Sequence, residues 1–431
     1  MTNLNAFEKR FPESGVFYLG HASIMAVLNG KKILFDPIVL AKPCDESWTF
    51  YPPQIRDGSF HNVDAVVVSH IHQDHYDVEF LKSLAPQAKL IIVGGRPEFE
   101  SDIKSKVQRT VNVIEPERTT EIFDGVFLHG VNHETNGVEA STIAFDARFC
   151  VYHGNDNYLS PEGLGKFKAP GRAVDVACVP YAFIHWYPFL LDCDGDALLD
   201  KQAEGRRLVD LYMDDCIRAI EILNPKLAIP FGANLLLQDG NAFSEMNLAV
   251  KTPFEFSDHA AAKSARLADV VRPLLAGDYC GLHAQAFEVV SHSQGSTGDY
   301  RLAADAYLKS LPGKRVGVDK SLPPVEEFVD KLNQKISGCD HEASDNLVQM
   351  ELKLPQRTLK IEIDCRSFSA ALVREFSRSR ATHQFTLDEY ASMSWLEGRR
   401  FEEIIGMRRF RLKRTPNVYA SNVLKFINTA L

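Results

Sequence analysis

The sequence lacks the patterns that would place it in several common classes of protein. Its eight cysteines are scattered and form no C-x-x-C pair, so nothing indicates a disulfide framework. No apolar run approaches the roughly 18–20 residues that a membrane-spanning helix requires. The formal net charge of −9 has the wrong sign for general affinity to nucleic acid. We therefore expect a cytoplasmic protein with reduced thiols, no transmembrane segment and no nucleic-acid partner.

Length and charge distribution suggest two parts. The chain has 431 residues, 45% of them hydrophobic, which is enough for a large core and more than one domain. We expect a main domain over 1–315 and a smaller α+β region over 316–431. Residues 351–431 contain 15 Lys and Arg against 9 Asp and Glu, an excess of six positive charges. This excess is compatible with an anionic small-molecule substrate, but a solvated basic face is the simpler explanation.

Apolar segments alternate with turns and amphipathic stretches, which predicts an α/β fold. Strands are expected at 15–19, 23–28, 31–35, 64–68, 90–93, 126–128, 139–145, 148–152, 174–180 and 226–230. Helices are expected at 78–85 and 203–223. Residues 231–311 show no readable pattern and are expected to be irregular. In the last part we expect a helix at 323–336 and paired strands at 347–354 and 358–363.

The strongest chemical signal follows the strand at 64–68. It reads Ser69-His70-Ile71-His72-Gln73-Asp74-His75, a dense run of imidazole and carboxylate groups at a strand end. These are the donors that zinc and iron prefer, so the run predicts a metal site. We expect His70, His72, Asp74 and His75 to bind metal. Asp74 has a second candidate role, as the catalytic proton acceptor.

Later strand ends offer further donors, namely His133, Asp156 and His185. We expect His133 to complete a three-histidine site with the first two histidines of the motif; His129 is the alternative. Asp156 is expected to bridge the first ion to a second one, which Asp74 and His75 would hold. Two such ions can hold a bridging hydroxide and polarise a substrate oxygen. His21, Asp36 and His153 are expected to orient the ligands.

The motif resembles the hallmark of the metallo-β-lactamase superfamily. Gly20-His21-Ala22-Ser23 and the segment 33–37 resemble the opening of the branch that holds the ascorbate-phosphate lactonases and the N-acyl-phosphatidylethanolamine phospholipases D. Segments 174–180 and 224–230 resemble later strands of the same family. The resemblance spans about residues 14–240. It implies a four-layer αβ/βα sandwich with a dinuclear site at one edge of its paired sheets.

The C-terminal region is similar to that of the CMP-N-acetylneuraminate hydroxylases. The segments Lys360–Cys365 and Arg414–Tyr419 carry this similarity. Those enzymes also have an N-terminal Rieske domain, which has no counterpart in this sequence.

One position departs from the superfamily pattern. The resemblance implies a last metal-binding histidine shortly after the strand at 226–230, but that position is Gly232. His185, His21 or Asn234 could substitute as a ligand or contact the substrate. Alternatively, the site holds a single ion, or the open position binds dioxygen or substrate.

Three functions follow from these residues. We favour a metal-dependent hydrolase that uses metal-bound hydroxide on a small anionic substrate of the phosphodiester, lactone or amide class. The first alternative is a non-haem iron oxygenase, resembling the hydroxylases above, with a separate electron donor. The second is a non-catalytic binding protein that kept the fold. The expected cofactors are one or two divalent ions, Zn²⁺ or Fe²⁺, with Mn²⁺ as a third choice.

Overall fold

The computed structural model describes most of the chain. The described residues are 3–42, 47–135, 137–182, 184–192, 200–238, 242–292, 295–311, 324–338, 343–378, 380–416, 423 and 426–427. The chain divides into two compact units, Met1–Ile184 with Arg206–Ser310, and His185–Gly205 with Leu311–Leu431. The expected boundary at residue 315 lies outside the described residues, as do residues 417–419 of the C-terminal resemblance.

The first unit is built on two large sheets. The eight-stranded sheet has the order β17-β16-β1-β2-β3-β5-β6-β7. Its strands are β1 (Ser14–Gly20), β2 (Ser23–Leu28), β3 (Lys31–Phe35), β5 (Ala65–Val67), β6 (Lys89–Val93), β7 (Val111–Ile114), β16 (Tyr279–His283) and β17 (Ala286–Val290). Strands β3, β5, β6 and β7 are parallel neighbours, so their carboxyl ends lie along one edge of the sheet.

The second sheet of this unit has the order β14-β12-β11-β10-β9-β8. Its strands are β8 (Thr120–Phe123), β9 (Val126–Asn132), β10 (Ala140–Phe145), β11 (Cys150–His153), β12 (Val176–Pro180) and β14 (Leu227–Phe231). One hydrophobic core contains buried residues of both sheets, including Ile24 and Ile91 of the first and Leu128 and Ile229 of the second. The two sheets therefore pack face to face.

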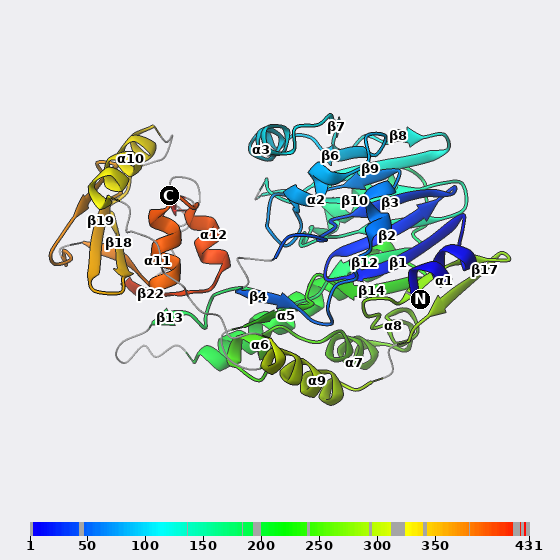
Figure 1. Ribbon diagram of the computed structural model, residues 1–431. Helices are drawn as coiled ribbons and strands as arrows, with labels where there is room; N and C mark the ends of the chain where they lie inside the picture. The colour runs from blue at the N-terminus through cyan, green and yellow to red at the C-terminus, as the bar shows by residue number, and fades with distance from the viewer. Residues whose placement is uncertain are drawn as a thin grey trace. The chain divides into compact units, whose positions relative to one another are not determined.

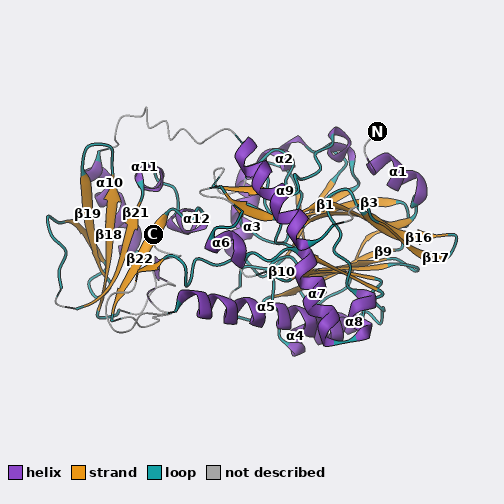
Figure 2. Ribbon diagram, turned by 90° about the horizontal axis from the view of Figure 1, so that it is seen from below, coloured by secondary structure: helices purple, strands orange, loops and turns teal. Residues whose placement is uncertain are grey.

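Helices cover both outer faces of this sandwich, as Figure 2 shows. A second core joins the first sheet to α1 (Asn3–Arg10), α2 (Val78–Ser83) and α3 (Pro97–Val107). On the other face lie α4 (Pro161–Gly165), α5 (Lys201–Leu223), α7 (Pro253–Lys263) and α8 (Ala265–Val270), with the short 3₁₀ helix η3 (Lys166–Lys168). This is the four-layer αβ/βα arrangement, so the predicted fold class is confirmed.

The prediction for residues 231–311 was wrong. The segment contains β15 (Leu235–Leu237), α6 (Glu245–Ala249), α7, α8, the β16–β17 hairpin and α9 (Thr297–Ser310). Strand β15 pairs with β4 (Trp48–Phe50), and η2 (Gly58–Asn62) is a further 3₁₀ helix. Several of these elements have only three to six residues, which is too short for a hydrophobic period to be visible in sequence.

The second unit is a smaller α+β domain, with its own sheet of order β13-β22-β21-β18-β19-β20. Its strands are β13 (Leu191–Asp192), β18 (Asn346–Lys353), β19 (Thr358–Asp364), β20 (Ser369–Leu372), β21 (Ala381–Leu387) and β22 (Phe410–Thr415). Its helices are α10 (Val325–Ser337), α11 (Glu389–Leu396) and α12 (Phe401–Gly406), all seen in Figure 1. Because β13 pairs with β22, residues 185–205 belong to this unit. Among the described residues, no helix is both long and apolar enough to cross a membrane.

Candidate metal centre

The histidine-rich motif lies in the loop between β5 and α2, at the carboxyl edge of the first sheet. Asp77 ends this loop and caps α2 by accepting the Phe80 amide. The other Asp77 oxygen accepts the amides of residues 39–41, at 2.6 to 2.9 Å, which ties the loop after β3 to the motif. The buried Arg96 guanidinium donates to the carbonyl oxygens of Ser69 and Val138. These contacts fix the backbone on both sides of the motif.

His70 and His72 face each other across the first half of the cluster. The Nε2 of His70 lies 2.8 Å from the Nδ1 of His72, while the Nδ1 of His70 lies 2.8 Å from the Ser69 hydroxyl. Donor atoms of His70, His72 and Glu139 all lie within 4.8 Å of one another. Two imidazole nitrogens that converge with a carboxylate form a set suited to a divalent ion.

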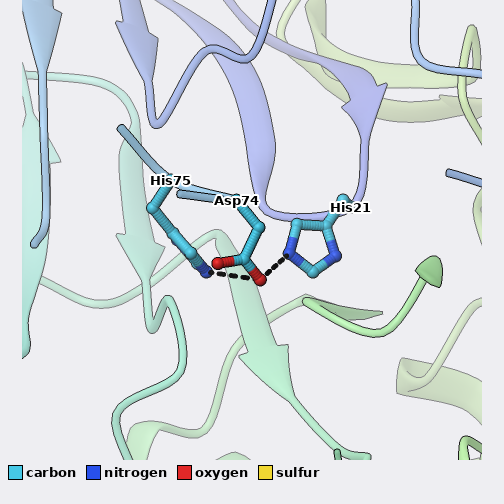
Figure 3. A group of neighbouring side chains, drawn as sticks. All are labelled: His21, Asp74 and His75. Atoms are coloured by element: carbon cyan, nitrogen blue, oxygen red, sulfur yellow. Dashed lines mark hydrogen bonds and ion pairs between the residues drawn. The ribbon is translucent and has the colours of Figure 1, made fainter. Parts of the chain in front are cut away.

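His75 occupies the second half of the cluster and is fully buried. Its Nδ1 lies 2.8 Å from Asp36 Oδ2. Its Nε2 lies 3.1 Å from Asp156 Oδ2 and 3.8 Å from Asp74 Oδ2. Figure 3 shows Asp74 between His75 and His21, with His21 Nε2 3.2 Å from the Asp74 carboxylate.

Asp36 connects His75 to the start of the motif through hydrogen bonds. One of its oxygens accepts the Ser69 amide at 2.7 Å, and the other accepts the Ser69 hydroxyl at 2.5 Å as well as facing His75. The carboxylate therefore fixes the ring orientation of His75 and leaves Nε2 turned toward Asp74 and Asp156. A carboxylate behind a metal-binding imidazole is the usual way in which proteins orient such a ligand.

Electrostatics differ between the two halves. Burial lowers the pKa of His70 well below its usual value, and the neighbouring His75, His72 and Arg96 add to this effect. Burial also opposes the charged form of His75, but the carboxylates of Asp156 and Asp74 raise its pKa well above the usual value. Burial opposes ionisation of Asp74 too, yet His75 and His21 lower its pKa. An ion bound here would displace the proton of His75.

The other predicted residues have the following contacts. His133 is in none of the three groups of convergent donors found among the described residues, and its Nδ1 accepts the Thr135 amide at 3.1 Å. The ring of His129 faces Thr119 and Phe167. His153 is buried against Phe35, and its Nε2 lies 2.8 Å from the Ala22 carbonyl oxygen.

The contacts of two further candidates, Asn234 and His185, are as follows. The side-chain oxygen of Asn234 lies 2.8 Å from the Tyr18 hydroxyl oxygen. His185 belongs to the second unit, where its ring lies beside Trp186.

Sequence reasoning missed Glu139, which is 8% exposed and lies just before β10. Its backbone pairs with that of His133, whose amide donates to the Glu139 carbonyl oxygen at the open end of the β9–β10 pair, while its side chain converges with His70 and His72. A single glutamate at the start of a strand is common, and no local pattern distinguishes this one. Its role becomes visible only when the two sheets are packed together.

Comparison with known proteins identifies the class. Residues 15–182 match the sequence profile of the beta-lactamase superfamily domain. The chain therefore contains a metallo-β-lactamase superfamily domain, as the motif predicted.

Curated relatives extend this picture. The chain is 37% identical over 152 residues to the UPF0173 metal-dependent hydrolase of Sulfolobus acidocaldarius, covering 33% of this chain and 61% of that protein. It is 34% identical over 89 residues to the N-acyl-phosphatidylethanolamine-hydrolyzing phospholipase D 1 of Caenorhabditis elegans, covering 19% and 25%. It is 32% identical over 114 residues to the human inactive cytidine monophosphate-N-acetylneuraminic acid hydroxylase, covering 25% and 23%.

These matches span between about a quarter and three fifths of the relatives' own lengths. They agree with the two narrower resemblances found in the sequence. The location of the hydroxylase similarity in the C-terminal region stays a prediction.

Proposed function

We propose that the protein is a metal-dependent hydrolase whose centre is the cluster at the carboxyl edge of the first sheet. The observation that carries the proposal is that donor groups converge around the loop that holds the motif, where Asp36, His70 and His75 form a further group. His70 and His72 meet Glu139 on one side, and His75 meets Asp74 on the other. The donor chemistry is that of a site for one or two divalent ions, with Zn²⁺ and Fe²⁺ as the first choices.

We assign the donor residues to two ions. His70, His72 and Glu139 would hold one ion, and Asp74, His75 and Asp156 would hold a second. A bound divalent ion supplies a nucleophilic water of lowered pKa and polarises the substrate oxygen. Asp36 keeps His75 in the required orientation through its 2.8 Å contact. The Asp74 carboxylate lies 3.2 Å from His21 Nε2 and 3.8 Å from His75 Nε2, within a convergent donor group, so we assign it to metal binding.

The substrate class is part of the proposal. A phosphodiester, lactone or amide would be attacked at the atom whose oxygen the centre polarises. The relative from Sulfolobus acidocaldarius is named a metal-dependent hydrolase and the one from Caenorhabditis elegans a phospholipase D, which supports hydrolysis here. The basic excess of the C-terminal region favours an anionic substrate.

A substrate panel tests this function. Metal-depleted protein is loaded separately with Zn²⁺, Mn²⁺ and Fe²⁺ and assayed on phosphodiester, lactone and amide substrates. We expect turnover of one class that requires metal and is lost in the double variant His70→Ala/His72→Ala. The variant His129→Gln is the matched control, because its ring is buried in the same unit and contacts Thr119 and Phe167. No hydrolysis in any metal form contradicts the proposal, and retained metal without turnover would favour a binding protein.

One observation supports an iron oxygenase as the second candidate. The group formed by His70, His72 and Glu139 is a two-histidine, one-carboxylate set, the donor combination of many non-haem Fe²⁺ oxygenases. Such an enzyme would need a separate electron donor. Anaerobic purification followed by metal analysis distinguishes the two functions. Tightly bound iron together with reductant-dependent O₂ consumption favours the oxygenase, whereas bound zinc without iron rules it out.

A further inference from the structure

The second half of the cluster has fewer nitrogen donors than the first. His75 is its single histidine from the motif, and its other donors are the carboxylates of Asp74 and Asp156. Gly232 lies beside this half, because a Cβ built on it would stand 3.4 Å from Asp156 Oδ1. Glycine offers no side-chain donor, so a further ligand has to come from another element.

His21, in the turn between β1 and β2, is placed to supply it. The side chain is fully buried, and its Nε2 lies 3.2 Å from Asp74 Oδ2. Its ring stands edge-on to that of His75, with centroids 5.4 Å apart. Donor atoms of His21, Asp74 and His75 lie within 4.8 Å of one another (Figure 3). Within the described part of the chain, the Nδ1 of His21 has no hydrogen-bond partner.

The backbone of His21 has an unfavourable conformation in this position. Its φ of 47° is in the left-handed region, which non-glycine residues seldom adopt. Two contacts stabilise the turn. The Tyr18 hydroxyl donates to the His21 carbonyl at 2.7 Å, and the Gly232 amide donates to the same oxygen at 3.0 Å. Gly232, which has no donor side chain, therefore helps to fix the backbone of His21, which has one.

The other nearby polar groups are already engaged. The side-chain oxygen of Asn234 lies 2.8 Å from the Tyr18 hydroxyl oxygen, and its amide nitrogen is not a metal donor. The Nε2 of His153 faces the Ala22 carbonyl oxygen at 2.8 Å. Among these three side chains, His21 alone directs a nitrogen toward Asp74 and His75.

We propose that His21 is a metal ligand, which completes the second half of the cluster together with Asp74 and His75. This inference rests on the proposed metal centre but not on its reaction. It predicts that the turn between β1 and β2, and not the loop after β14, provides the last nitrogen donor. The ion expected there is a divalent cation that accepts a mixed imidazole and carboxylate set.

Two variants test the inference without forcing the backbone. Both His21→Gly and His21→Asn accept a positive φ, so the turn keeps its conformation when the imidazole is removed. His129→Gln is the matched control. Metal-depleted proteins are titrated with Zn²⁺ against a chromogenic chelator, and folding is checked by circular dichroism. We expect two ions per chain in wild type and in the control, with the weaker-held ion of both His21 variants losing at least about 100-fold in affinity.

A spectroscopic measurement distinguishes metal binding by His21 from a role in which His21 only orients Asp74. In the Co²⁺-loaded protein, each coordinated imidazole contributes a hyperfine-shifted, exchangeable N–H proton signal. We expect one such signal fewer in His21→Asn than in wild type. An unchanged number of signals, or unchanged affinity for both ions, overturns the role of His21 while leaving the metal centre intact. A wild-type protein that binds a single ion also overturns it, and one that binds none refutes the proposed function as well.

Discussion

Replacing Asp36 by asparagine is expected to weaken metal binding while leaving the fold intact. Asp36 Oδ1 accepts the Ser69 amide at 2.7 Å, and Oδ2 lies 2.8 Å from His75 Nδ1. In Asp36→Asn the oxygen can still accept the Ser69 amide. The new NH₂ group then points at the Nδ1–H of His75, which loses its acceptor.

Two estimates of the effect agree. A hydrogen bond to a charged group contributes about 1.5–3 kcal/mol, which corresponds to roughly 10–150-fold in a binding constant. Removing the carboxylate partner of a metal-binding histidine typically costs about 10–100-fold in metal affinity. We therefore expect the Zn²⁺ affinity of the half that contains His75 to fall by one to two orders of magnitude.

The assay is competition with a chelator of known affinity, on metal-depleted wild type and variant, with thermal unfolding measured alongside. Asp57→Asn is the control, because Asp57 also accepts a backbone amide, that of Ser59 at 2.8 Å, but belongs to neither donor group. The control should bind as wild type does. If Asp36→Asn folds normally and binds both ions with wild-type affinity, the proposed orienting role of Asp36 is refuted.

Three further predictions concern the second ligand group, the sheet packing and the second unit. Glu139→Gln should lower the affinity of the ion held by His70 by at least about 10-fold in the same titration, and an unchanged affinity would remove Glu139 from the site. Gly130→Ala should destabilise the protein by about 1–3 kcal/mol in urea unfolding, because its Cβ would overlap the Val93 side chain of the facing sheet; no loss of stability would contradict this packing. The pKa of His383 is lowered by burial to about 4, below the unfolded value of about 6.5. Between these two pKa values the imidazole is protonated in the unfolded chain but not in the folded one, so the free energy of unfolding should fall by up to about 3 kcal/mol from pH 6.5 to 4. His383→Leu should make the free energy of unfolding depend less steeply on pH in this range. An equally steep dependence in the variant would contradict the assignment.

Much of the first unit could be predicted because its strands are long enough to show their pattern. The turn at Asn29 and Gly30, with φ values of 47° and 74°, has the residue pair that a tight hairpin favours, and it connects β2 to β3 as expected. The histidine motif was readable for a related reason. Its donors are consecutive in sequence, so no tertiary contact is needed to bring them together.

The rest of the cluster depends on contacts between distant segments. His21 reaches Asp74 because of a left-handed turn, and His is not a residue from which that conformation could be predicted with any specificity. Glu139 reaches His70 through the packing of one sheet on the other. The short helices after β14 could not be predicted either, because elements such as α6 are shorter than two helical turns.

The most direct test of the metal centre is anomalous X-ray diffraction from crystals of the metal-loaded protein. The account predicts one ion bound by His70, His72 and Glu139, and a second bound by Asp74, His75, Asp156 and His21. Ions bound elsewhere, or no ion at these residues at saturating metal, would contradict it.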